Sequence, residues 1–73
     1  AHDRIVRDPK IMMGKPCIKG TRITVELILS YLGDGLTPTQ IIEGHPHLSE
    51  ADILAAAAYA SEYLAQEGLI AAE

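Results

Sequence analysis

The chain has 73 residues, of which 48% are hydrophobic, and a formal net charge of −4 at pH 7. It is long enough for one domain with a thin core, and its longest apolar runs, 27–29 and 53–60, are too short to cross a bilayer. The polar, charged segment 1–7 does not resemble a signal peptide, and the single cysteine, Cys17, forms no bridge within the chain. We therefore expect a cytoplasmic protein with no membrane partner and a second copy to complete its core.

Charge is divided sharply along the sequence. All six Lys and Arg residues fall in the first 22 positions with only two acids, whereas eight acids and no Lys or Arg follow. Such a basic segment indicates contact with nucleic-acid phosphates or with a polar partner. The alternative is that it is merely solvated, or pairs with acidic helices of a second subunit.

Residues 4–23 are expected to be extended, with turns between short strands. Arg4–Arg7 is a strand candidate, Ile11–Met13 is a second short apolar run, and Cys17–Lys19 leads into the next turn. Two prolines in this segment cannot donate to a ladder, so its strands belong to a hairpin or an edge. A ribbon of this size is unstable alone and must lie on the helices or pair with another subunit.

The first helix is expected from Val25 to about Leu32, with Thr24 as its N-cap. Its core stripe, spaced i, i+3, i+4 and i+7, consists of Val25, Ile28, Leu29 and Leu32. Leu27 and Tyr31 form a second apolar face. This helix is therefore expected to lie between the core and a partner.

The second helix has the clearest start signal in the chain. Thr37 is a suitable N-cap, Pro38 follows it, and Gln40 completes a capping box. The helix is expected to end near 43–44, two turns later.

The third helix opens with another capping box, made of Ser49 and Asp52, and is expected to run over 50–67 with Gly68 after it. We expect Ile53, Ala57, Ala60 and Leu64 to form a stripe along it, with Leu54 and Ala56 beside that stripe.

No residue pattern indicates catalysis. The segment 14–21 lacks the Lys-Ser/Thr pair of a phosphate-binding loop. Cys17 is expected to be a small buried residue rather than a nucleophile, and His45 and His47 lack an evident third metal ligand. We expect no enzyme activity and no cofactor; a small metal-dependent enzyme that uses the two histidines is a remote alternative.

Three capped helices indicate a helix-turn-helix unit, although the connection 43–49 is longer than the usual turn. The third helix carries acids in its first turn and no Lys or Arg, which argues against base reading by it. Several strings, at 5–11, 14–23, 35–38 and 45–49, are similar to the signature of the domain-of-unknown-function family 433 over roughly residues 4–64. This resemblance implies a homeodomain-like trihelical fold with a β arm, commonly dimeric, in antitoxins of VapB type encoded beside toxins with a PIN-like nuclease domain.

We therefore predict a mainly α protein, with a β-hairpin arm at 1–23 and a three-helix, homeodomain-like unit at 24–73. The predicted function is that of a non-catalytic, homodimeric, DNA-binding antitoxin-like regulator; the alternative is a protein-interaction module that neutralises a PIN-like toxin without DNA. The residues predicted to contact nucleic acid are Arg4, Arg7, Lys15, Lys19, Thr21 and Arg22. Those predicted to contact a partner or a second copy are Ile5, Val6, Ile11, Leu27, Tyr31, Tyr59 and Tyr63.

Overall fold

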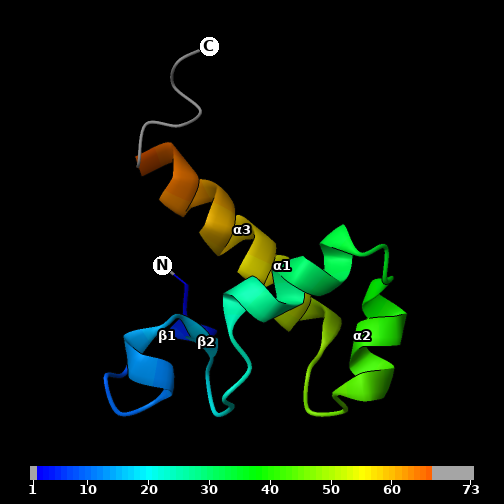
Figure 1. Cartoon of the computed structure of the whole chain (residues 1–73), viewed down its shortest axis with the longest axis horizontal. Coiled ribbons are helices and arrows are strands. Elements are labelled where there is room, and N and C mark those ends of the chain that lie inside the picture. The colour runs from blue at the N-terminus through cyan, green and yellow to red at the C-terminus, as the bar shows by residue number, and fades with distance from the viewer. Residues whose placement is uncertain (1, 67–73) are drawn as a thin grey trace.

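Three helices follow a small β-ribbon in the computed structural model, which describes residues 2–66 (Figure 1). The prediction of a mainly helical protein with a short β-hairpin is confirmed. The elements are β1 (Ile5–Val6), a 3₁₀ turn η1 (Met12–Gly14), β2 (Cys17–Ile18), α1 (Val25–Gly33), α2 (Pro38–Gly44) and α3 (Glu50–Gln66).

The ribbon lies on the helices and is connected to them through the backbone. Strand β1 pairs antiparallel with β2, with Val6 opposite Cys17, and Cys17 also forms a bridge with Thr24 on its other side. Cys17 and Ile18 are buried, and Ile18 belongs to the same apolar core as the helices. The ribbon is therefore part of the folded body, which is one of the two arrangements expected from the sequence.

The expectation of extended chain at Ile11–Met13 is wrong for its last two residues. Met12 and Met13 have φ of 50° and 57°, in the left-handed region, and the chain turns there instead of continuing as a strand. The backbone N–H of Gly14 donates to the carbonyl oxygen of Ile11 at 3.1 Å. Met13 is 87% exposed, so this apolar residue occupies a loop tip and contributes nothing to a strand face.

The helix starts are those that the capping residues predict. The Thr24 hydroxyl accepts from the backbone N–H of Leu27, and Thr37 forms a full capping box at the start of α2. At the start of α3, the Ser49 N–H donates to Asp52 at 3.0 Å, and the Asp52 N–H donates to the Ser49 hydroxyl at 3.3 Å. These bonds satisfy N–H groups that a helix leaves unpaired at its first turn. The predicted end of α3 at 67 and 68 lies outside the described residues.

The core lies where the three helices meet the ribbon, and the predicted inward face of α3 is rotated. Ala56 is fully buried and Ala57 is exposed, the reverse of the expected order. Asp52 is also buried, so the buried face is centred between Asp52 and Ala56 and not between Ile53 and Ala57. The buried apolar residues are Cys17, Ile18, Val25, Ile28, Ile41, Leu48, Ile53 and Ala56. None of the helices within residues 2–66 is long and apolar enough to span a membrane.

Candidate interaction site

The third helix is much longer than the helix that it packs on. Helix α3 has 17 residues and α1 has nine. At a rise of about 1.5 Å per residue, these lengths correspond to roughly 26 and 14 Å. The C-terminal turns of α3 therefore extend past the other helices (Figure 1). Their apolar side chains are only partly covered: Tyr63 is 45% exposed and Leu64 is 41% exposed.

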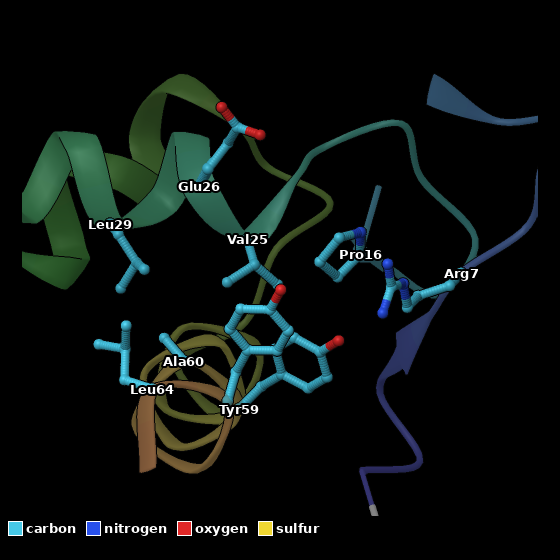
Figure 2. Close-up of a pocket in the computed structure, with 9 residues that line it drawn as sticks. Arg7, Pro16, Val25, Glu26, Leu29, Tyr59, Ala60 and Leu64 are labelled. Atoms are coloured by element: carbon cyan, nitrogen blue, oxygen red, sulfur yellow. The ribbon is translucent and has the colours of Figure 1, made fainter. Parts of the chain in front are cut away.

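An apolar groove of about 290 Å³ lies between these turns, α1 and the ribbon. Figure 2 shows Leu29 from α1 and Leu64 from α3 pointing toward each other, with Ala60 beside them. Arg7 and Pro16 lie at the other end of the groove. The groove is lined by Arg7, Pro16, Val25, Glu26, Leu29, Tyr59, Ala60, Tyr63 and Leu64.

The two tyrosines of α3 form an aromatic wall of this groove. Tyr59 and Tyr63 are one turn apart, and their ring centroids are 6.4 Å apart with planes 15° from parallel. His2 contacts Tyr59 edge-on, with centroids 5.5 Å apart, and its Nε2 lies 2.8 Å from Oε1 of Glu62. A smaller hollow of about 150 Å³ follows this wall, and Arg7 lines both hollows.

The charge at the groove comes chiefly from Arg7. Its Nε donates to the carbonyl oxygen of Gly14 at 3.2 Å, and no carboxylate within residues 2–66 forms an ion pair with it. The guanidinium has further N–H donors on its two Nη atoms. Glu26, on the rim, is paired with Lys15 at 3.2 Å. Among the carboxylates of residues 2–66, none forms an ion pair with the guanidinium of Arg7, which lies beside an apolar floor.

The six residues predicted to contact nucleic acid have different surroundings. Arg4 pairs with Asp52 at 3.0 Å and Lys15 pairs with Glu26, so both have carboxylate partners within the chain. The Thr21 hydroxyl donates to the carbonyl oxygen of Ile18 and accepts from the N–H of Ile23, at 2.8 and 3.0 Å. The Thr21 hydroxyl therefore stabilises the turn that follows β2, through hydrogen bonds within the chain.

Lys19 and Arg22 are exposed, as is Lys10, and no ion pair joins any of them to a carboxylate of the described residues. With Arg7, they are the basic side chains of the arm that form no ion pair within residues 2–66.

Asp52 is a buried carboxyl that links α3 to the arm. Burial acts to raise its pKa, but hydrogen bonds from Ser49 and Arg4, together with the charge of Arg4, outweigh burial and hold the pKa below its ordinary value. The carboxylate therefore joins the first turn of α3 to the arm in its ionised form. This ion pair spans 48 positions in the sequence and was not predicted.

Only some of the residues predicted to contact a partner line the groove. Tyr59 and Tyr63 line the groove, whereas Leu27 and Tyr31 on α1 do not. Tyr31 packs against the core, and its hydroxyl lies 3.0 Å from Nε2 of His45, at the end of α2. In the ribbon, Ile5 packs against the core, and Val6 and Ile11 are half-buried.

Leu29 and Leu64 belong to the groove but were predicted only as members of helical stripes. The predicted helices, 25–32 and 50–67, already differ in length. This difference indicates that the last turns of the longer helix are only partly covered by the shorter one.

Cys17 is buried in β2, as predicted, and burial raises the pKa of its thiol, although the nearby charge of Arg22 acts in the opposite direction. The thiol is therefore protonated at neutral pH and poorly reactive. Within residues 2–66, no three His, Cys, Asp or Glu side chains gather as a metal site would require.

The described residues thus form a small, mainly helical domain with a β-ribbon and one apolar groove beside a free arginine. The chain belongs to the family described as "Protein of unknown function (DUF433)", whose model matches residues 5–60. That range covers the ribbon, α1, α2 and most of α3, while Tyr63 and Leu64 lie beyond it. No curated protein and no solved structure matches the chain.

Proposed function

We propose that this protein is a non-catalytic, antitoxin-like binding module that docks a protein partner in the groove between α1 and α3. The observation that supports the proposal most is the pair of partly exposed residues, Tyr63 and Leu64, beside an apolar floor. Tyr and Arg side chains that become desolvated in a groove carry much of the affinity of protein interfaces, and apolar contacts around them exclude water. The family resemblance suggests a PIN-like toxin as the partner, and the thin core favours a homodimer as the acting form.

Two leucines of α3 provide a matched test. Leu64 lines the groove, whereas Leu54 is 63% exposed and does not line it. A PIN-domain protein, chosen as the candidate partner, is purified separately, and the dissociation constant of its complex with this protein is measured by isothermal titration calorimetry. We expect Leu64→Ser to weaken the complex at least about tenfold, since burying a leucine side chain is worth about 1.5–3 kcal/mol, and Leu54→Ser to change it less than about twofold. Equal effects of the two substitutions would contradict the proposal.

DNA binding by the basic arm is the second candidate function. It is supported by Lys10, Lys19 and Arg22, which are exposed and paired with no carboxylate of the described residues. Helix α3 presents Glu50 and carries no Lys or Arg, so this binding would rely on phosphates and not on base reading by that helix in a helix-turn-helix manner.

A salt titration of operator-length DNA tests this function. If three residues from each of two copies contact phosphates, the log–log slope of affinity against salt is about −5. Lys19→Gln should make it less steep by about 2 units in the dimer. A slope near zero rules out this candidate while leaving the groove proposal intact.

A further inference from the structure

We infer that the groove selects a partner segment of a particular chemistry: an amphipathic helix that inserts an aliphatic side chain between Leu29 and Leu64 and places a carboxylate against Arg7. This inference rests on the proposed protein-binding function and specifies what the partner must present. The juxtaposition of an apolar floor with one uncompensated guanidinium is the feature that supports it.

The floor suits a protruding side chain better than an enclosed small molecule. Its volume of about 290 Å³ lies at the lower limit of ligand sites, which are roughly 300–1,000 Å³, and the groove is open along one side. Leu29, Ala60 and Leu64 approach from two helices (Figure 2). Their aliphatic surfaces leave room for a leucine-sized side chain from a helix laid along α3, which is the usual mode of helix-in-groove recognition.

The charges around the groove favour an acidic partner. Glu26, on the rim of the groove, is paired with Lys15, and Glu62 does not line the groove itself but lines the adjacent hollow, with its Oε1 2.8 Å from Nε2 of His2. Arg7 has no carboxylate partner among the described residues, and the hydrogen bond from its Nε to the Gly14 carbonyl oxygen holds the guanidinium in place. The Nη donors remain for a carboxylate, which arginine binds through two parallel hydrogen bonds.

The hydroxyls of Tyr59 and Tyr63 belong to side chains that line both hollows with Arg7, so further donors are close to the same carboxylate. A basic segment would meet an unshielded like charge at this position. The predicted partner therefore carries an acidic residue next to its apolar anchor.

Two synthetic peptides test this chemistry. Each is an amidated helix of about four turns, with leucines on one face and, beside them, either one glutamate or one lysine. Binding to the full chain is measured by fluorescence anisotropy. We expect the glutamate peptide to bind about five- to tenfold more tightly than the lysine peptide, the range expected for one exposed charge contact replaced by a repulsion.

Charge reversal in the protein makes the test specific. Arg7→Glu should reverse the preference for the two peptides, whereas Arg22→Glu makes the same change of charge on a residue that does not line the groove and should preserve it. Leu64→Ser should weaken both peptides equally. Thermal melting followed by circular dichroism verifies that each variant is folded.

Three outcomes would overturn the inference, and each is distinct from failure of the proposed function. Equal binding of both peptides, or a preference unchanged by Arg7→Glu, would show a groove without charge selection. Binding of neither peptide, while the PIN-domain protein still binds in a Leu64-dependent way, would leave the function standing with another partner chemistry. Self-association that Leu64→Ser abolishes and that excludes the peptides would identify a second copy as the occupant.

Discussion

The N-terminal and C-terminal halves of α3 differ in the contacts that attach them to the rest of the protein. The first half is capped by Ser49, buries Ile53 and Ala56, and is joined to the arm through a carboxylate that is almost completely covered. The second half places Tyr63 and Leu64 at a groove and is joined to the arm through His2 and the exposed Glu62. The comparison indicates that the first turns of this helix belong to the core, whereas its last turns leave apolar side chains partly exposed.

The largest difference between the halves should appear when an aliphatic side chain is shortened. Ile53 is buried, so Ile53→Ala should lower the free energy of unfolding by about 2–4 kcal/mol, because it removes apolar contact and leaves a cavity. Leu64→Ala should cost less than about 1 kcal/mol, since that side chain is already partly in water. Urea denaturation measures both values. Equal costs would show that the last turns of α3 belong to the core.

The next largest effect concerns the cap of α3. Asp52→Ala removes the acceptor for the Ser49 N–H and the partner of Arg4, and we expect a loss of about 1–2 kcal/mol in the free energy of unfolding. Glu50→Ala is the control, because Glu50 is an exposed acid in the same turn; it should change stability by less than about 0.5 kcal/mol. Asp52→Asn should recover part of the loss, since its amide oxygen can still accept from Ser49.

Acid should remove the contribution of the Asp52 charge. The folded-state pKa of Asp52 lies below the ordinary value of 3.8, so the folded protein binds this proton less readily than the unfolded chain. The stability from this group is therefore fully present above the ordinary value and is lost as the pH falls through the folded pKa. The difference in unfolding free energy between the wild type and Asp52→Asn should shrink over that acidic range. A difference independent of pH would show that the ion pair with Arg4 contributes nothing.

The smallest effect is expected at the second link between α3 and the arm. Glu62→Gln removes the charge opposite His2, but the Glu62 side chain is 63% exposed, so water already screens this pair. The free energy of unfolding should fall by less than about 0.5 kcal/mol. A loss as large as that of Asp52→Ala would remove the distinction between the two links.

Local signals in the sequence predicted the helices well. Thr24, Thr37 and Ser49 each accept a hydrogen bond from within the following helix turn, and such contacts depend only on residues three positions apart. The apolar run at 11–13 was wrongly predicted to be extended throughout, because apolar character alone does not distinguish a strand from a loop tip. The tight turn at Met12 and Met13 is set by positive φ angles, which these residue types rarely adopt.

The groove was harder to predict because it depends on distant elements. Tyr59 and Tyr63 were predicted to contact a partner and they line the groove, but their neighbours Arg7 and Leu29 come from other segments of the chain. Ala56 and Ala57 follow Ile53 by three and four residues, so the helical period allows either of them to share its buried face. In the structure Ala56 is buried, four residues after the buried Asp52. The ion pair of Arg4 with Asp52 likewise follows from how the ribbon lies on α3, which no pattern within either segment reveals.

The position of Cys17, with β1 on one side and Thr24 on the other, has a consequence for dissection of this protein. Cutting the polypeptide between residues 23 and 24 would separate the helices from Ile18, which fills part of their shared interior. A chimera that exchanges the front segment with that of a relative must therefore exchange matching interior residues as well. The ribbon and the helices must therefore be engineered together, as one unit.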